Sequence, residues 1–207
     1  MSIKLPTYSF KIVVLGESAV GKTSILLRFH KNQFSTQLEP TIGASHVQKS
    51  INMTDCHIQL LIWDTAGQEQ YHSLAPMYYR GARGALIVYD RTNYKSFERA
   101  KDWIKELKSK GSPNVRIVLV GNKIDLETNN VDTSEALTYA KENDMLFFET
   151  SAKTGEGIQE AFLALVKLLP KKDENDENLN NSQSNDNFLY LHNMTQNKKK
   201  KKSDGCC

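Results

Sequence analysis

Short apolar runs alternate along this chain with longer stretches in which apolar residues recur every three or four positions. The short runs, rich in Val, Ile and Leu, are typical of strands buried on both faces, and the longer stretches are typical of amphipathic helices. We expect strands at 10–16, 58–64, 85–90, 115–123 and 145–150, and helices at 24–32, 94–110, 133–143 and 158–169. Thr133 or Ser134 is the expected N-cap of the third helix. The alternation predicts an α/β fold, in which helices cover both faces of a mostly parallel sheet.

The composition changes at Pro170, after which eight of the 37 residues are Asn. Asp, Glu, Ser and Lys fill much of the rest, and such a segment cannot bury enough apolar surface to fold. We therefore expect an N-terminal extension at 1–7, one domain at 8–170 and a flexible tail at 171–207. The apolar patch at 188–191 is either a docking motif or a part of the unstructured tail.

The overall charge and the cysteines argue against two classes of protein, nucleic-acid-binding proteins and disulfide-rich secreted proteins. The formal net charge of +3 comes from 27 Lys and Arg against 24 Asp and Glu, which is too small to indicate a nucleic-acid-binding protein. No run of 18 apolar residues is present, so we expect no membrane-spanning helix. Two of the three cysteines are adjacent, which excludes a disulfide framework and favours a reducing compartment. Cys56 lies in an apolar run and is expected to be buried.

The first candidate site follows the first strand. The segment GESAVGKT at 16–23 fits the pattern G-x-x-x-x-G-K-[ST] of a phosphate-binding loop. Gly16 and Gly21 let the backbone curl so that its N–H groups point at phosphate oxygens, beside the N-terminus of a helix. Lys22 is expected to reach the β- and γ-phosphates, and the Thr23 hydroxyl is expected to hold Mg²⁺. A Gly-rich turn without a ligand is the alternative interpretation.

The motif GNKID, which follows a later strand, indicates which base such a site would hold. Guanine presents two donors, N1–H and the 2-amino group, on one edge, and the Asp125 carboxylate can accept both. Adenine presents an acceptor there, so a site of this kind rejects it by a factor of about 10⁴ or more. Asn122 is expected to tie the loops together, and the stem of Lys123 to pack on the ring. In ETSAK at 149–153, the N–H of Ala152 is placed to meet guanine O6.

Two further loops carry residues suited to sensing a γ-phosphate. In WDTAGQE, Asp64 is placed to reach Mg²⁺ through water. The Gly67 N–H is placed to bond the γ-phosphate, which requires a residue without a side chain in the way. Gln68 is expected to orient the attacking water. In FSTQLEPTIG, Thr41 is expected to give its hydroxyl to Mg²⁺ and its N–H to the γ-phosphate, a role that depends on the neighbouring motifs.

With these four loops in this order, the chain closely resembles the Ras superfamily of small GTPases over about residues 8–170. The stretch YHSLAPMYYRGA at 71–82 and the paired cysteines resemble the Rab family. Within it, GESAVGKTS and YHSLAPMYYRGA are most similar to the early-endosomal subgroup. The resemblance implies the Ras-like form of the P-loop NTPase fold, a six-stranded, mostly parallel sheet with five helices. It also implies binding of GTP or GDP with Mg²⁺, slow hydrolysis of GTP and a role in vesicle traffic.

The resemblance also implies a set of site residues. It makes Gln68 the catalytic residue and places Phe34 against the edge of the guanine ring. The metal site is expected at Thr23, Thr41 and Asp64. The residues expected to bind the nucleotide are Gly16, Ser18, Ala19, Val20, Gly21, Lys22, Thr23, Ser24, Phe34, Thr41, Gly67, Asn122, Lys123, Asp125, Ser151, Ala152 and Lys153.

Two positions depart from the family pattern. In the family, a Phe together with residues that match Trp63 and Tyr78 forms an aromatic effector surface, and here His46 replaces the Phe. The choice of effector therefore does not follow from the resemblance, and His46 is either a neutral polar replacement or a pH-sensitive contact. Gln70, beside Gln68, stands where the family usually has Arg and is expected to alter partner contacts. Neither change touches the nucleotide-binding motifs.

The last ten residues, KKKKKSDGCC, predict membrane attachment. Asp204 excludes a C-a-a-X box, whereas Cys206 and Cys207 suit double geranylgeranylation, as the Rab resemblance implies. Two lipid chains give stable anchoring where one gives marginal anchoring, and the lysines at 198–202 add at most about 1 kcal/mol each on anionic lipid. We expect the protein on the cytoplasmic face of intracellular, endosomal membranes, with a cytosolic pool. A nuclear-localisation signal, nucleic-acid contact and a chance cysteine pair are the alternatives.

The expected partners follow from the resemblance. They are a GTPase-activating protein that supplies an arginine, a guanine-nucleotide exchange factor, a prenylation escort, a GDP-dissociation inhibitor and GTP-state effectors, with no nucleic acid. Two other functions compete with this interpretation. One is a scaffold that binds GTP but hardly hydrolyses it, against which Gln68 argues. The other is a P-loop ATPase or kinase, against which GNKID and ETSAK argue.

Overall fold

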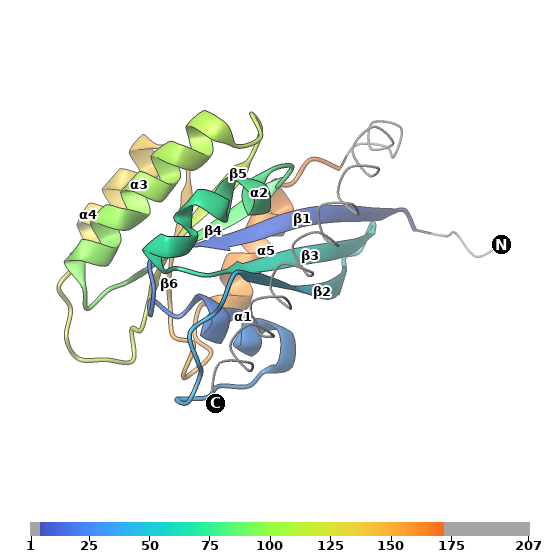
Figure 1. Cartoon of the computed structure of the whole chain (residues 1–207). Helices are drawn as coiled ribbons and strands as arrows, with labels where there is room; N and C mark the ends of the chain where they lie inside the picture. Colours follow the sequence, from blue (N-terminus) through green and yellow to red (C-terminus); the bar gives the residue numbers. More distant parts are fainter. Residues whose placement is uncertain (1–4, 172–207) are drawn as a thin grey trace, which may run out of the picture. The chain divides into compact units, whose positions relative to one another are not determined.

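The computed structural model describes residues 5–171, which form one sheet surrounded by helices (Figure 1). The strands are β1 (Thr7–Leu15), β2 (Ala44–Asn52), β3 (His57–Thr65), β4 (Gly84–Asp90), β5 (Arg116–Asn122) and β6 (Leu146–Thr150). The helices are α1 (Lys22–Lys31), α2 (Ala75–Tyr79), α3 (Tyr94–Lys110), α4 (Thr133–Glu142) and α5 (Ile158–Leu168), with a 3₁₀ helix η1 (Glu69–Leu74) directly before α2. The predicted tail after residue 171, including the patch at 188–191, the lysines at 198–202 and the cysteines Cys206 and Cys207, lies outside the described residues.

The sheet has six strands in the order β2-β3-β1-β4-β5-β6. β1 pairs in parallel with β3 and β4, and β5 pairs in parallel with β4 and β6. Only β2, at one edge, is antiparallel to its neighbour β3. The six-stranded, mostly parallel α/β sheet that the resemblance implies is therefore confirmed.

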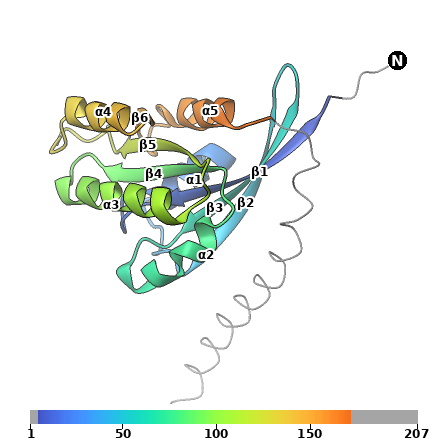
Figure 2. The ribbon, with the colours of Figure 1, turned by 90° about the horizontal axis from the view of Figure 1, so that it is seen from above.

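Helices cover both faces of this sheet (Figure 2). α1 and α5 pack on one face, where the rings of Phe29 and Phe162 stack with centroids 3.8 Å apart. α3 packs on the other face, over β4, and α2 lies against β1 and β3. Because both faces are covered, all seven residues of β4 are buried, which is typical of a central parallel strand.

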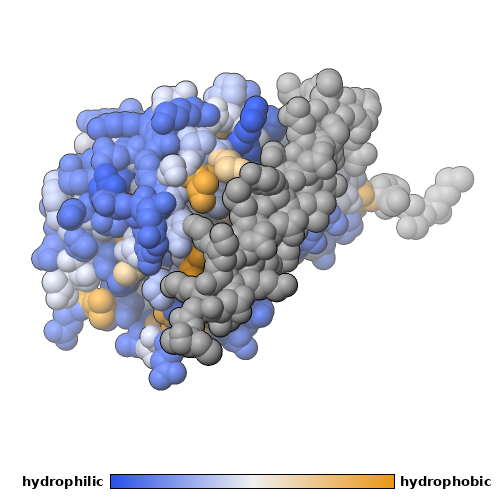
Figure 3. All heavy atoms as spheres, in the orientation of Figure 1, coloured by the Kyte–Doolittle hydropathy of each residue, from blue (hydrophilic) through white to orange (hydrophobic). Residues whose placement is uncertain are grey.

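Polar residues dominate the outside. Hydrophilic residues cover most of the described part of the face drawn in Figure 3. The largest fully buried side chains are instead apolar or aromatic, and Cys56, expected to be buried, is only 1% exposed. Within residues 5–171, no helix combines the length and the apolar content that a bilayer crossing requires.

Three elements were not predicted from the periodicity. β2 is an edge strand in which no residue is fully buried, and only the partly buried Val47 and Ile51 pack against the core. Its sequence therefore lacks the continuous apolar run of a central strand. η1 and α2 are each too short to show a helical repeat, because they have only six and five residues.

Two details also differ from expectation. The N-cap of α4 is Asp132 rather than Thr133 or Ser134, and its side chain accepts a hydrogen bond from the Ser134 N–H at 2.8 Å. The Asp132 carboxylate, one residue before Thr133, accepts directly from the backbone N–H of Ser134, so Asp132 is the N-cap. β1 begins at Thr7 rather than at residue 10, the predicted start of the strand, because Thr7 already pairs with His57 on β3.

Candidate functional site

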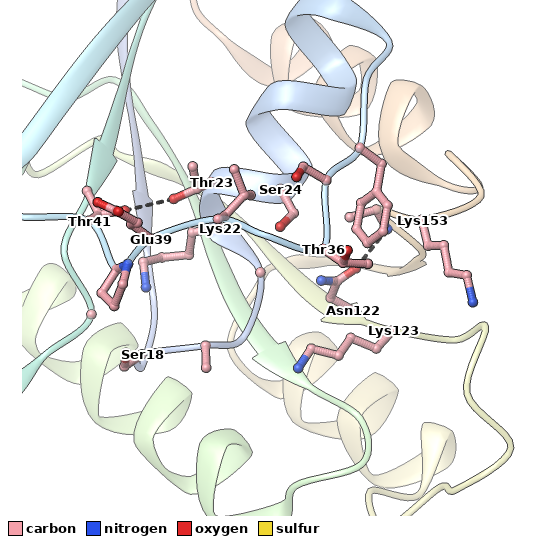
Figure 4. A pocket seen from close by; sticks show the side chains of 18 of the residues that line it. Ser18, Lys22, Thr23, Ser24, Thr36, Glu39, Thr41, Asn122, Lys123 and Lys153 are labelled. Atoms are coloured by element: carbon pink, nitrogen blue, oxygen red, sulfur yellow. Dashed lines mark hydrogen bonds between the residues drawn. The ribbon is translucent and has the colours of Figure 1, made fainter.

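A cavity of about 470 Å³ opens where the parallel strands β1, β3, β5 and β6 end. Five segments line it: 18–24, 34–41, 67–68, 122–126 and 152–153. Each segment lies at the C-terminal end of a different strand or helix. The fold therefore brings residues more than 100 positions apart in the sequence to one place (Figure 4). The volume suits a small-molecule ligand, for which about 300–1,000 Å³ is typical.

Most of the predicted site residues meet in this cavity. Those that line it are Ser18, Ala19, Gly21, Lys22, Thr23, Ser24, Phe34, Thr41, Gly67, Gln68, Asn122, Lys123, Asp125, Ala152 and Lys153. The other four residues expected to bind nucleotide or Mg²⁺ do not line it but hold residues that do, through hydrogen bonds. The Gly16 and Val20 carbonyls accept from Lys22 and Asn122. The Ser151 hydroxyl donates to Asp125, and the Asp64 carboxylate accepts from Thr23.

Lys22 lies at the start of α1 and is buried. Its Nζ donates to the carbonyls of Gly16 at 2.9 Å and Glu17 at 2.7 Å. Burial lowers the pKa of Lys22 to about 8, although the carboxylates of Asp64 and Glu17 act in the opposite direction. The amine is thus held among oxygen atoms, in a place where an anionic ligand would stabilise its charged form.

Gly67 faces this lysine from the loop after β3. A Cβ at this position would overlap the Lys22 Nζ and the backbone of Glu17. Only glycine therefore allows the two loops to approach so closely.

Thr23, Thr41 and Asp64 converge beside the lysine. The Thr23 hydroxyl donates to Asp64 Oδ2 at 2.7 Å. It also lies 2.9 Å from the Thr41 hydroxyl (Figure 4). Within residues 5–171, the buried Asp64 Oδ1 has no hydrogen-bond partner. Burial raises the pKa of the Asp64 carboxyl, while the Thr23 hydrogen bond and Lys22 oppose the rise. A buried carboxylate oxygen without a partner, next to two hydroxyls, fits the oxygen ligands that Mg²⁺ prefers.

Asn122 closes the opposite end of the cavity. It is 1% exposed, and its Nδ2 donates to the Val20 carbonyl at 2.8 Å. Its Oδ1 accepts from the Thr150 hydroxyl and the Ala152 N–H, each at 3.2 Å. One amide thus ties together the loops after β1, β5 and β6, as expected. The Ala152 N–H, expected to meet a base oxygen, is engaged by Asn122 in this structure.

Asp125 presents its carboxylate to the cavity from a fixed position. Its Oδ1 accepts from the Ser151 hydroxyl at 2.6 Å, and its Oδ2 lies 3.9 Å from the Lys153 Nζ. The neighbouring Lys123 Nζ lies 2.6 Å from Asp90 Oδ2, which draws its stem across the cavity rim. The carboxylate is therefore oriented before any ligand arrives.

Arg28 on α1 was not predicted to take part in the site. Its Nε donates to the Ala152 carbonyl at 3.0 Å, and its Nη2 donates to the Lys153 carbonyl at 2.6 Å. It therefore holds the loop after β6 in place. No motif marks this role, because the two carbonyls that Arg28 binds after β6 lie more than 120 positions away in the sequence. Further lining residues that were not singled out are Ser35, Thr36, Leu38, Glu39, Pro40 and Leu126.

The predicted aromatic surface lies on β2, β3 and α2. The ring centroids are 5.2 Å apart for His46 and Trp63, and 6.0 Å apart for Trp63 and Tyr78. Tyr78 is only 5% exposed, so it packs near the Trp63 ring but adds little exposed surface itself. Ile42, two residues before β2, and Met77, on α2, are among the exposed large apolar side chains of the described residues.

The chain also matches a family model. The model described as the Ras family matches residues 11–171. All five segments that line the cavity fall within this range.

Proposed function

Since the chain belongs to the Ras family and is therefore a small GTPase that acts as a molecular switch, we propose that it is a switch of the Rab type in endosomal vesicle traffic. As a member of the family it binds GTP and GDP and hydrolyses GTP. The observation that carries the Rab assignment is the stretch YHSLAPMYYRGA, which contributes most of η1 and all of α2. This stretch borders the Trp63 ring, where a partner would sense the nucleotide state.

The phosphates bind at the end of the cavity that α1 and the loop before it form. The backbone N–H groups of 16–23 and the α1 N-terminus supply donors for the α- and β-phosphates. The Lys22 amine exchanges its contacts with Gly16 and Glu17 for the β- and γ-phosphates. The bound anion then keeps the buried amine charged.

Thr23, Thr41 and Asp64 are the residues that would hold Mg²⁺, the two threonines directly and Asp64 through water. When bound, the ion neutralises charge on the β- and γ-phosphates. The chain supplies the hydroxyl of Thr23 from α1 and that of Thr41 from the loop before β2. Because Thr41 comes from the loop before β2, its position depends on whether Mg²⁺ and the γ-phosphate are bound.

The base lies at the Asn122 end. The Asp125 carboxylate accepts from guanine N1–H and the 2-amino group, and Ser151 keeps it oriented. The stem of Lys123 packs on one face of the ring, and Phe34 meets its edge. Because Asp125 would face an acceptor in adenine, the site discriminates against ATP.

The switch is the movement of two loops toward the γ-phosphate. Thr41 and Gly67 contact that phosphate and lose the contact on hydrolysis. A change from 1:99 to 99:1 needs about 5.5 kcal/mol of differential binding, and charge-assisted contacts of about 1.5–3 kcal/mol each can supply it. Gln68 orients the attacking water. An activating protein supplies an arginine in trans and accelerates hydrolysis by about 10³–10⁵.

The tail attaches this switch to membranes. Two prenyl chains on Cys206 and Cys207 anchor it, and the lysines at 198–202 favour an anionic surface. A prenylation escort delivers the protein, and a GDP-dissociation inhibitor maintains a cytosolic pool. A guanine-nucleotide exchange factor loads GTP, and effectors bind the GTP form on the cytoplasmic face of endosomes.

A fractionation experiment tests the membrane part of the proposal. The full chain and the double variant Cys206→Ser/Cys207→Ser are expressed in cultured eukaryotic cells, and membranes are sedimented. We expect the full chain partly in the membrane pellet and the double variant entirely in the supernatant, because without lipid the lysines alone bind too weakly.

A third variant separates charge from lipid. Replacing the lysines at 198–202 by Gln should reduce the pelleted fraction without abolishing it, while GTP binding stays unchanged in all three proteins. Equal partitioning of the full chain and the cysteine variant would refute lipid anchoring.

A further inference from the structure

The carboxamide of Gln68 is held by its neighbour Gln70. Gln70 Nε2 donates to Gln68 Oε1 at 2.7 Å, between two side chains on the solvent side of the cavity. Gln68 itself lines the cavity, next to Gly67. The oxygen that would accept a hydrogen bond from an attacking water is thus engaged by another donor.

The backbone that carries this contact is itself fixed. The Tyr71 N–H donates to the Gln68 carbonyl at 3.0 Å, which closes the first turn of η1. On its other side η1 is attached to α3. Glu69 lies 3.4 Å from Arg99, and the His72 ring packs on Trp103 with centroids 4.4 Å apart. Gln70 therefore reaches back to Gln68 from a defined position.

From this geometry we infer that Gln70 is a positioning residue. Its hydrogen bond holds Gln68 in a side-chain conformer that does not orient the attacking water, and this lowers the basal rate of GTP hydrolysis. The inference rests on the proposed role of Gln68. Orienting water requires the Gln68 oxygen as an acceptor, and the bond to Gln70 turns that oxygen toward η1. A partner that binds η1 and takes over the Gln70 amide would release Gln68 for the reaction.

The expected effect is modest, because the bond is exposed and water competes for both side chains. A net hydrogen bond of this kind corresponds to a rate change of about twofold to fivefold. Gln70→Met keeps the length of the side chain but removes the donor. Single-turnover hydrolysis of GTP with Mg²⁺, without an activating protein, should therefore be about twofold to fivefold faster in Gln70→Met than in the wild type.

The matched control is Gln59→Met, which makes the same change at an exposed position of β3 away from the cavity. It should leave the rate unchanged. Dissociation rates of GTP and GDP should be the same in all variants, because Gln70 does not line the cavity. A faster release of nucleotide in Gln70→Met would show a general loosening and would overturn the inference.

The variant Gln68→Leu separates this inference from the proposed function. If Gln68→Leu hydrolyses GTP as fast as the wild type, the proposed role of Gln68 fails. If Gln68→Leu is slow but Gln70→Met equals the wild type or is slower, only the inference about Gln70 fails. In the double variant Gln68→Leu/Gln70→Met the acceleration should vanish, and an acceleration that persisted there would contradict positioning through Gln68.

Discussion

Lys11 on β1 holds its amine in a half-buried position. Its Nζ lies 4.9 Å from the centroid of the Trp63 ring and donates to the Arg80 carbonyl at 2.9 Å. Burial lowers the pKa of Lys11 to about 8. One side chain thus connects β1, the ring on β3 and the C-terminal end of α2.

The lowered pKa of Lys11 predicts how stability changes with pH. Between the folded pKa of about 8 and the ordinary value of 10.5, the unfolded chain binds more protons than the folded one. The free energy of unfolding contributed by Lys11 therefore rises as the pH increases through this window. The variant Lys11→Met lacks this contribution to the pH dependence, because methionine does not titrate.

Chemical denaturation of the GDP-bound wild type and Lys11→Met between pH 7 and pH 10 measures the effect. Other groups titrate in both proteins, so the difference between the two free energies of unfolding isolates Lys11. As the pH rises above about 8, the free energy of unfolding of the wild type should increase relative to that of Lys11→Met. Parallel pH curves would contradict the assignment.

At the scale of elements, Glu106 fastens the segment after Gln68 to α3. Its carboxylate, 14% exposed, accepts from the Tyr79 hydroxyl at 3.0 Å and lies 3.3 Å from His72 Nε2. Lys110 approaches the same carboxylate at 3.5 Å. Residues of both η1 and α2 therefore meet at one side chain of a rigid helix.

Glu106→Ala should destabilise the protein by about 1–3 kcal/mol, because the hydroxyl of Tyr79, a residue only 1% exposed, loses its partner. The matched control is Glu98→Ala on the same helix, where an exposed ion pair with Lys101 contributes at most about 1 kcal/mol. Denaturation of both variants measures the two losses. Equal losses would show that Glu106 does not fasten this segment.

The long elements could be predicted from the sequence, but the short and edge elements could not. α3 occupies the predicted range 94–110, because its apolar face repeats over several turns. β2 went unpredicted because this edge strand has no fully buried residue and so no continuous apolar run, and α2 because five residues show no period. The N-cap of α4 was expected at Thr133 or Ser134, one or two positions after the residue that caps it, Asp132.

The cavity could be predicted because its motifs are local loops at strand ends, where parallel sheets bring ligand-binding residues together. The predicted tie through Asn122 is present for this reason. Arg28 and the contact between Gln70 and Gln68 could not be predicted. The first depends on chain segments far apart in the sequence, and the second on the orientation of two side chains.

For the whole molecule, the central claim is that one phosphate group determines the arrangement of two loops, 34–41 and 67–74. Both border the cavity, and the contact between the Thr23 and Thr41 hydroxyls already joins the first loop to α1. The loops should be ordered by GTP and released in GDP, while the central strands β4 and β5 remain unchanged.

Amide hydrogen exchange tests this claim most directly. The protein is loaded with GDP or with a non-hydrolysable GTP analogue, both with Mg²⁺, and exchange is followed by peptide. We expect exchange in 34–43 and 66–79 to be about tenfold slower or more in the analogue form, since each lost charge-assisted contact corresponds to at least that factor, with β4 and β5 alike in both. Identical exchange of these two segments in the two forms would contradict the account.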